Sequence, residues 1–402
     1  MPAAEQLPIL ELDEGFWDHA TPARFPKQVL RFRNDRAARD IGLDTLSAAE
    51  WEDAFARFAP LEGNLSCPLA LRYHGHQFGV YNPHLGDGRG FLYAQIRGFD
   101  LGTKGSGTTP WSRGGDGRLT LKGGVREILA SEMLEALGVP TMRSLSLFET
   151  GESLIRGDEP SPTRSSVLVR LGRTHIRFGT FQRLARLGDA RRMTALVDHV
   201  VRHYYPELEA HEGDARIVAL LDRVVAKSAD LCASWMAAGF CHGVLNTDNM
   251  TITGESFDYG PWRFVPWWDR DFVAAYFDHG GLYAFGRQPA AVEWNLMRLA
   301  DALQLVAPHT HLASTVVDFE DRYEEALTRR VLARMGRAPG DPIEDDALVR
   351  ETIAHLESTK SRLPGPTLLI DEVEAIWKEI AEHDDWAPFE AKIAEIRASI
   401  AP

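Results

Sequence analysis

The sequence predicts an α+β protein whose first half is small and mixed and whose second half is larger and mainly helical. Before residue 186, short apolar runs bounded by turn residues read as strands, most clearly at 91–96, 144–148 and 166–171. From about residue 190, apolar residues recur at helical spacing and predict helices over 193–205, 215–238, 292–305, 321–335, 348–363, 372–383 and 389–400. We therefore expect an N-terminal extension packed on the body (1–70), a small lobe (71–185) and a helical lobe (186–402).

Two helices of the first half carry end signals of their own. Ser47 precedes a helical pattern over 47–58, and Glu50 stands three residues later, where it completes a capping box. A second helix is predicted after Arg126, because its apolar residues follow the i, i+3, i+4, i+7 spacing and Gly138 stands where a helix should end.

Composition bounds the class of protein. The 402 residues are 44% hydrophobic, which is enough for the cores of two or three lobes. Lys and Arg number 44 against 58 Asp and Glu, a net charge of −14. This balance argues against a nucleic acid or an anionic membrane as the main partner.

Cysteine usage and the start of the chain indicate the compartment. Cys67, Cys232 and Cys241 are too few and too scattered for a disulfide framework or a zinc site. The first residues lack a signal-peptide pattern, and no stretch approaches the length of a membrane span. We expect a cytoplasmic protein, and a monomer.

Side chains that could act in catalysis or metal binding are most concentrated between His242 and Gly260. Asp248 and Asn249 stand side by side, residues 250–253 read as a strand, and a turn at Gly254 should form a hairpin that returns Asp258 towards Asn249. A carboxylate and an amide oxygen suit Mg²⁺, which takes its remaining ligands from waters and phosphates.

This interpretation leaves Asp248 available as a general base. The order of His, Asp, Asn, hairpin and Asp-aromatic-Gly follows the logic of a protein-kinase active site, although kinases separate the base from the Asn by several residues. The alternative is that residues 246–249 form an ordinary polar turn, which Asn and Asp favour.

Two glycine-rich blocks are candidates for binding phosphate. Gly86, Gly88 and Arg89 precede an apolar run, and glycine allows backbone N–H groups to approach an anion closely. The second block holds three cations, Lys104, Arg113 and Arg118. The alternatives are a plain hairpin turn for the first block and a solvated loop for the second.

Three further charged residues complete the pattern of a phosphate site. Glu127 lies in the first turn of a predicted helix, from which it could pair with Lys104, as a kinase Glu pairs with its strand Lys. Arg170 and Arg177 flank a glycine, and two guanidinium groups suit a triphosphate. Glu127 could equally be a simple first-turn acid, and the arginines could be scattered over the surface.

Taken together, these motifs resemble the selenoprotein-O family of kinase-fold proteins, also called the YdiU family. The resemblance spans Tyr73 to about Leu303, and nine motifs occur in order. They are Tyr-His-Gly-His-Gln-Phe-Gly, Leu-Gly-Asp-Gly-Arg, Lys-Gly-Ser-Gly, Ser-Arg-x-Gly-Asp-Gly-Arg, Arg-Glu, His-Ile-Arg-Phe-Gly, His-Gly-Val-Leu-Asn-Thr-Asp-Asn-Met, Asp-Tyr-Gly-Pro and Tyr-Ala-Phe-Gly-Arg-Gln-Pro.

The resemblance implies a bilobal, protein-kinase-like fold and a protein adenylyltransferase. Such an enzyme transfers AMP from ATP, bound in a flipped orientation, to Ser, Thr or Tyr hydroxyls of proteins, and releases pyrophosphate. It implies Asp248 as the catalytic base, Asn249 and Asp258 as ligands of Mg²⁺ or Mn²⁺, and Glu127 as the support of Lys104. The nucleotide-binding residues that it implies are Gly86, Gly88, Arg89, Lys104, Asp116, Gly117, Arg170, Arg177 and Asp258.

Three alternative functions stay open on the sequence. They are UMP transfer from UTP, a conventional kinase-type transfer of the γ-phosphate, and an inactive nucleotide-binding pseudokinase scaffold. The sequence also departs from the family, because no cysteine follows Cys241. The redox-active cysteine or selenocysteine near the family's C-terminus is therefore not expected, and the sequence leaves redox control open.

Overall fold

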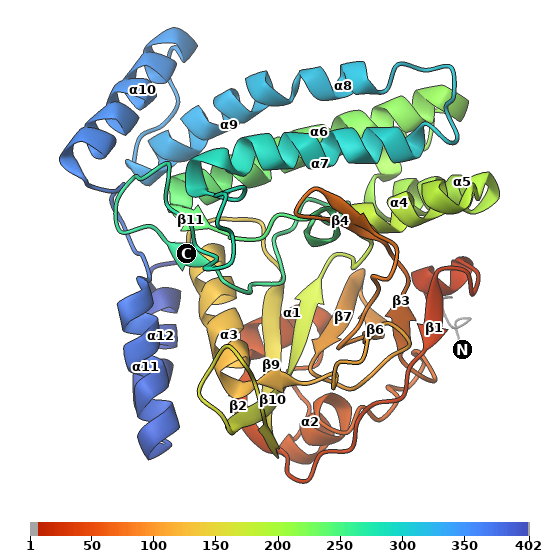
Figure 1. Ribbon diagram of the computed structural model, residues 1–402, viewed down its shortest axis with the longest axis vertical. Coiled ribbons are helices and arrows are strands. Elements are labelled where there is room, and N and C mark those ends of the chain that lie inside the picture. The colour runs from red at the N-terminus through yellow and green to blue at the C-terminus, as the bar shows by residue number, and fades with distance from the viewer. Residues whose placement is uncertain (1–6, 401–402) are drawn as a thin grey trace. The chain divides into compact units, whose positions relative to one another are not determined.

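A computed structural model describes residues 7–400, and the chain divides into two compact units (Figure 1). The first unit runs up to Ile128 and also contains Met142–Glu212 and Thr251–Thr253. The second contains Leu129–Thr141, Gly213–Met250 and the chain from Gly254 onward. Each unit is described by itself.

The first unit is built on an antiparallel sheet of eight strands. Its order is β1-β3-β6-β7-β10-β9-β2, with β8 paired to β10. A separate hairpin pairs β4 with β5. The strands are β1 (Trp17–His19), β2 (Val29–Arg33), β3 (Leu69–Leu71), β4 (Gly75–Gln77), β5 (Val80–Asn82), β6 (Leu92–Ile96), β7 (Phe99–Lys104), β8 (Leu119–Thr120), β9 (Arg143–Leu154) and β10 (Thr163–Gly172).

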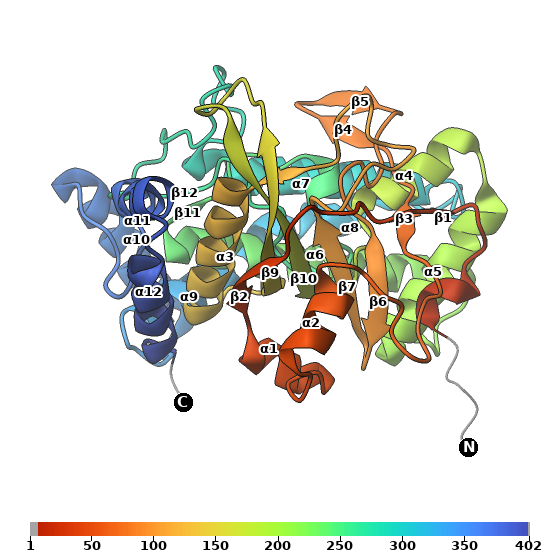
Figure 2. The same cartoon turned by 90° about the horizontal axis from the view of Figure 1, so that it is seen from below.

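Two short helices, α1 and α2, cover one face of this sheet, and the hydrophobic core of the unit lies between them and the strands. Buried side chains of α1 and α2, among them Ile41, Trp51 and Phe55, pack with Phe148 of β9 and Val169 of β10. The two helices lie beside the sheet in both views (Figures 1 and 2). The helices of this unit are η1 (Pro8–Glu11), α1 (Asp35–Ile41), α2 (Ala48–Phe55), α4 (Phe178–Leu187), α5 (Ala190–Tyr204) and η2 (Pro206–Leu208).

Helix α3 (Leu121–Ala136) contains the first division between the units, which falls after Ile128. Its first two turns therefore belong to the sheet unit. The capping box predicted at Ser47 and Glu50 is present at the start of α2, with both reciprocal hydrogen bonds formed.

The second unit is mainly helical. Its long helix α6 packs against α7, α8 and α9, and α10 packs against α9 (Figure 1). The elements are α6 (Gly213–Ala238), β11 (Phe240–Cys241), η3 (Thr247–Asn249), β12 (Arg263–Phe264), η4 (Phe285–Arg287), α7 (Gln288–Leu303), α8 (Ala313–Val317), α9 (Phe319–Arg334), α10 (Pro342–Thr359), α11 (Ile370–His383) and α12 (Ala387–Ala398).

The predicted fold class, a mixed α+β protein, is confirmed, with the sheet in the first half of the chain and helices dominating the second. The predicted N-terminal extension supplies both edge strands of the sheet, β1 and β2. The first unit extends to Glu212, so it also includes α5. The domain boundaries at residues 70 and 185 stay a prediction. Within residues 7–400, none of the helices combines the length and the apolar character needed to cross a bilayer.

Candidate functional site

A buried cluster of three charged side chains lies in the first unit. Lys104 Nζ is 2.6 Å from Glu127 Oε2, and Arg170 Nη1 is 3.0 Å from Glu127 Oε1. The side chains of Lys104, Glu127 and Arg170 are 5%, 2% and 7% exposed. The predicted pairing of Lys104 with Glu127 is therefore present, and Arg170 joins the same carboxylate.

Strand register explains why these residues meet. Arg170 on β10 stands opposite Gly102 on β7, two residues before Lys104. Because side chains alternate along a strand, Lys104 and Arg170 project from the same face. Glu127, from α3, binds both. Lys104 is the last residue of β7.

The charges of this cluster favour an anion. Two cations, Lys104 and Arg170, contact one carboxylate among side chains that water barely reaches. Electrostatic attraction is stronger in such a setting than at the open surface. Arg89 and Arg113 are exposed, and neither forms an ion pair with a residue in the described range 7–400. Both could therefore add contacts to a phosphate group.

The first glycine-rich loop lies against the end of β7. Gly105 donates its N–H to the carbonyl of Arg89 at 2.6 Å, so the predicted phosphate loop runs beside Lys104. A Cβ at Gly86 would meet Trp111 Cγ at 2.3 Å, and one at Gly88 would meet the Trp111 carbonyl oxygen at 2.8 Å. Both glycines are thus required by close packing on Trp111, which the sequence pattern did not reveal.

Asp87, within that loop, is a site residue that we did not select from the sequence. It is buried, and its carboxylate accepts the backbone N–H of Leu71 at 3.1 Å and lies 3.3 Å from Arg177 Nη2. Burial raises the pKa of Asp87, and the Arg177 charge opposes that rise. Arg177 also stacks on Tyr73, 4.4 Å from the ring centroid. The sequence signal that could have indicated Asp87 is its position between Gly86 and Gly88.

The second glycine-rich block differs from the prediction. Asp116 is exposed and binds Arg156, with Nη1 at 2.8 Å from Asp116 Oδ2. Arg118, expected among the free cations of an anion site, is held by Glu152 at 2.8 Å. Gly117 has φ +68°, and an added Cβ would meet the backbone of Gly107 at 2.2 Å, so this glycine is required by its turn.

In the second unit, the predicted metal-binding residues come together. Asn249 Nδ2 donates to Asp258 Oδ2 at 3.3 Å. Asp248 and Asn249 lie in η3 and are each 8% exposed, whereas Asp258 is half-buried. Asp258 has φ +64°, a left-handed conformation that Asp tolerates better than most residues.

The predicted hairpin between Asn249 and Asp258 is wrong. Thr251 pairs instead with Arg177 within the first unit, and Ser256 pairs with Thr141 within the second. The two halves of the expected hairpin thus each find another partner, because the backbone groups of residues 251 and 256 bond to segments distant in sequence. The proximity of Asn249 and Asp258 was nevertheless predicted correctly.

Buried amides and an imidazole fix the loop that carries Asp248. Gln288 Nε2 donates to the Phe240 carbonyl at 3.0 Å, and Gln288 Oε1 accepts the His242 N–H at 2.9 Å. His242 Nε2 lies 3.0 Å from the Phe257 carbonyl oxygen and so holds the residue before Asp258. In the same loop, Asn295 donates to the Leu245 carbonyl and Tyr283 to Asn246. Of these supports, only His242 stood within the stretch that the sequence pattern singled out.

The donor set at Asn249 and Asp258 fits a magnesium or manganese ion. Asn249 Oδ1 is buried and accepts no hydrogen bond within the described part of the chain, an uncommon state for a buried amide oxygen. It stands on the same carboxamide whose nitrogen reaches Asp258. A hard cation takes ligands of this kind, a carboxylate and an amide oxygen.

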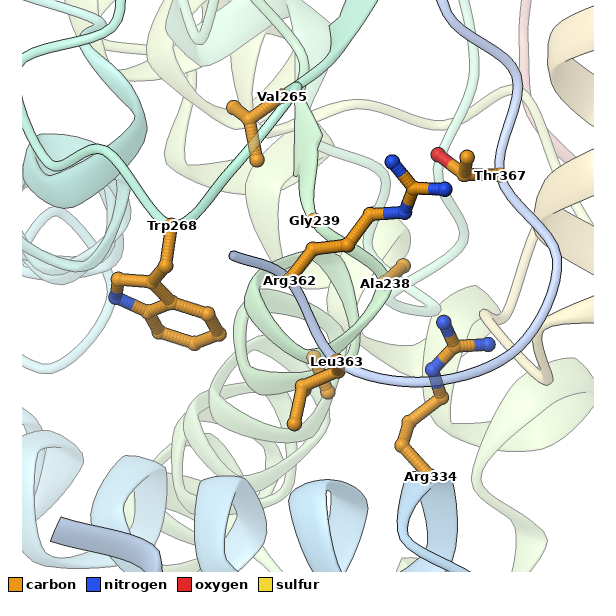
Figure 3. A pocket seen from close by; sticks show the side chains of 9 residues that line it. Ala238, Gly239, Val265, Trp268, Arg334, Arg362, Leu363 and Thr367 are labelled. Atoms are coloured by element: carbon orange, nitrogen blue, oxygen red, sulfur yellow. The ribbon is translucent and has the colours of Figure 1, made fainter. Parts of the chain in front are cut away.

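A small pocket of the second unit contains none of the predicted site residues (Figure 3). Arg334 and Arg362 line it together with Trp268 and Leu363, and no carboxylate is among the lining residues. Arg334 Nη2 reaches the Pro366 carbonyl at 3.5 Å. Because the pocket holds neither a base nor a metal ligand, we assign it no part in nucleotide chemistry.

Comparison with known proteins decides the family. The family model described as "Protein adenylyltransferase SelO" matches residues 5–365. The chain belongs to the SelO family. Relatives of this SelO chain named "Protein nucleotidyltransferase YdiU" include one from Synechocystis sp., 51% identical over 369 residues, which cover 89% of this chain and 77% of the relative. Another, from Gloeobacter violaceus, is 43% identical over 97% of this chain and 96% of the relative.

The predicted resemblance is therefore confirmed, and the SelO chain is a nucleotidyltransferase by family. A third relative with the same name, from Rhodopseudomonas palustris, is 38% identical over 94% of this chain and 80% of its own.

Proposed function

We propose that this SelO-family protein transfers AMP from ATP to Ser, Thr or Tyr hydroxyls of proteins. The observation that carries the proposal is the buried cluster in which Lys104 and Arg170 both contact Glu127, in a chain whose family is described as protein adenylyltransferase. The cluster supports the binding of phosphate groups, and the family description supports transfer of the nucleotidyl group.

In this proposal the first unit binds the nucleotide. Lys104 and Arg170 contact phosphate oxygens, and Glu127 keeps both cations in place. The loop at Gly86, Gly88 and Arg89 and the guanidinium of Arg177 add donors for the phosphates. Asp116 and Gly117, at the second loop, are assigned to the nucleotide by family resemblance alone. We also propose that the two units are the lobes of a protein-kinase-like fold.

The second unit supplies the groups that act on the acceptor. Asp248 accepts the proton of the attacking hydroxyl, whose oxygen forms a bond to the α-phosphorus while the bond from that phosphorus to the bridging oxygen breaks and pyrophosphate leaves. Asn249 and Asp258 would hold Mg²⁺ or Mn²⁺. When bound, such an ion neutralises charge on phosphate oxygens.

Attack at the α-phosphate requires ATP to bind in the orientation opposite to that of an ordinary kinase. This part of the proposal rests on the family description, because cations and glycines recognise phosphate without selecting which phosphorus is attacked. UTP is the alternative donor, because groups that recognise phosphate do not distinguish the two bases.

Analysis of the co-product tests the proposal. The purified protein is incubated with an acceptor protein, Mg²⁺ or Mn²⁺, and either ATP or UTP, and pyrophosphate and nucleoside diphosphate are both quantified. Adenylyl transfer predicts one pyrophosphate for each modified hydroxyl with ATP, and loss of this product in Asp248→Asn. Release of one ADP for each phosphorylated acceptor would establish a kinase. Preference for UTP would establish a uridylyltransferase, and nucleotide binding without any product would establish a scaffold.

A further inference from the structure

A second cluster of metal-ligating side chains lies in the first unit, outside the residues assigned to nucleotide transfer. It consists of Glu11 in η1 and of His199 and His203 in α5. Their candidate ligand atoms all lie within 4.8 Å of one another. We propose that Glu11, His199 and His203 bind a divalent transition-metal ion, with Zn²⁺ as the probe of choice. This inference does not depend on the proposed function.

The spacing of the two histidines suits a metal. Residues four apart on a helix lie on one face, and the rings of His199 and His203 have centroids 4.7 Å apart. Glu11 approaches the same point from a segment distant in sequence, with Oε2 2.9 Å from His203 Nε2 and 3.7 Å from His199 Nδ1. Two imidazoles and a carboxylate form a common ligand set for zinc, with a further position left for water.

His199 supplies the independent observation. It is 2% exposed, and neither of its ring nitrogens forms a hydrogen bond within residues 7–400. The distance of 3.7 Å from His199 Nδ1 to Glu11 Oε2 is too long for a hydrogen bond. A buried histidine is normally satisfied by a partner, so a ligand bond would explain both its burial and its orientation towards Glu11.

Two neighbours bear on the affinity. Arg202 Nη1 lies 2.9 Å from Glu11 Oε2, so an ion would share that carboxylate with a guanidinium, which weakens binding. The ring of Tyr204 packs edge-on against both histidines. These features favour a structural site of moderate metal affinity that links η1 to α5. They do not favour a catalytic centre open to substrate.

Equilibrium dialysis of the chelator-treated full chain against Zn²⁺ tests the proposal, with Co²⁺ absorption as a second readout of the ligands. We expect one ion per chain, and at least about tenfold weaker binding in His203→Ala and in Glu11→Gln. These two positions are less buried than His199, and circular dichroism verifies that each variant is folded. Zn²⁺ should raise the unfolding temperature of the wild type and not that of His203→Ala.

Controls separate this site from others that could take the ion. Cys67→Ser removes a thiol whose Sγ lies 2.8 Å from His19 Nδ1, and Asp258→Ala removes the proposed magnesium ligand. Both should keep the Zn²⁺ ion, as should His309→Ala at an exposed position. Failure of the folded wild type to bind Zn²⁺, or unchanged binding in both His203→Ala and Glu11→Gln, would overturn the proposal.

Discussion

Glu127 holds together the buried charges of the first unit. Its two carboxylate oxygens each serve a different cation, one from β7 and one from β10. The neutral amide of glutamine has nearly the same shape, yet it would take from the buried Lys104 and Arg170 the carboxylate charge that both contact. The cost of removing one partner from a buried ion pair exceeds the value of the pair itself.

We therefore predict that Glu127→Gln lowers the free energy of unfolding by about 3–5 kcal/mol, measured by urea denaturation. The control is Asp346→Asn, which removes one of two acidic partners of Arg350 in an exposed pair whose side chains are 66% and 42% exposed. That change should cost far less stability than Glu127→Gln, because water screens the exposed pair. Equal effects of the two substitutions would contradict the importance of burial.

Asp258 combines a left-handed backbone with a carboxylate, and two substitutions separate these properties. Asn tolerates the left-handed region but lacks the charge, whereas Ala lacks the charge and also tolerates that region poorly. We predict that both variants lose nucleotide transfer by at least about 100-fold, while only Asp258→Ala loses about 1 kcal/mol of stability. Transfer assays and unfolding midpoints measure the two effects.

A matched control for this pair is Asp384, which has φ +50° at the end of α11. Asp384→Ala should lower stability by a similar amount and leave transfer unchanged. If Asp258→Asn retained full transfer, the carboxylate would have no part in the reaction.

His74 predicts a pH dependence of stability. Burial, followed by the positive charge of Arg183, lowers the pKa of His74 from 6.5 to about 4. Below pH 6.5 the unfolded chain gains a proton at His74 that the folded chain does not accept until about pH 4. Stability should therefore fall as the pH drops through this window, by at most about 3 kcal/mol and less where water reaches the ring.

The measurement is the free energy of unfolding of wild type and His74→Gln between pH 7.5 and about pH 4. The difference in the free energy of unfolding between the two proteins should be constant above pH 6.5. Below that pH, the wild type should lose stability relative to His74→Gln. The Tyr81 hydroxyl, 2.6 Å from His74 Nδ1, stays neutral throughout, because burial raises the pKa of Tyr81 to about 12. A constant gap over the whole range would show that His74 titrates normally.

At the scale of elements, α7 positions the loop that carries Asp248. Gln288, at the start of this helix, is fully buried and bonds to the backbone of both Phe240 and His242. Asn295, about two turns later, bonds to the Leu245 carbonyl. The loop is thus held by side chains of one helix.

We predict that Gln288→Ala lowers the rate of transfer by about 10- to 100-fold with little change in ATP affinity, because it loosens the base and leaves the phosphate-binding groups intact. The control is Glu293→Ala, an exposed position on the same helix. Single-turnover rates and nucleotide titrations separate the two quantities. A loss of ATP affinity equal to the loss of rate would argue against a positioning role.

The sequence predicted elements well where local pattern decided them and less well where distant partners did. The helices of the second unit, the Ser47 capping box and the pairing of Lys104 with Glu127 followed from spacing. Strands β1 and β2 are too short to show a period, and they exist because β3 and β9 offer them edges. The hairpin at residues 250–258 failed for the same reason, since its backbone groups pair elsewhere.

At the scale of the whole molecule, the predicted change from mixed to helical texture was correct, although the first compact unit reaches Glu212. Helix α5 stays with the sheet unit, where Glu11 of η1 contacts His203 and Arg202. Such contacts depend on the fold and leave no local trace in the sequence. In the same way, the joining of Arg170 to Glu127 depends on strand register, which spacing alone does not reveal.

The proposal for the whole molecule assigns phosphate binding to one unit and proton removal to the other. Substitutions in the first unit should therefore lower ATP affinity, whereas those in the second unit should lower the rate of transfer. We predict that Lys104→Met weakens ATP binding by about tenfold or more, whereas Asp248→Asn abolishes transfer and leaves ATP binding within about twofold of the wild type. Nucleotide titration of the folded variants measures this difference, and equal losses of ATP affinity would contradict the division of roles.

The most direct test of nucleotidyl transfer is incubation of the purified protein and an acceptor with Mg²⁺ or Mn²⁺ and ATP labelled at either the α- or the γ-phosphate. We predict protein-bound label from the α-phosphate only, and its loss in Asp258→Asn and Asp248→Asn. Label from the γ-phosphate alone would contradict the central claim and indicate a conventional kinase.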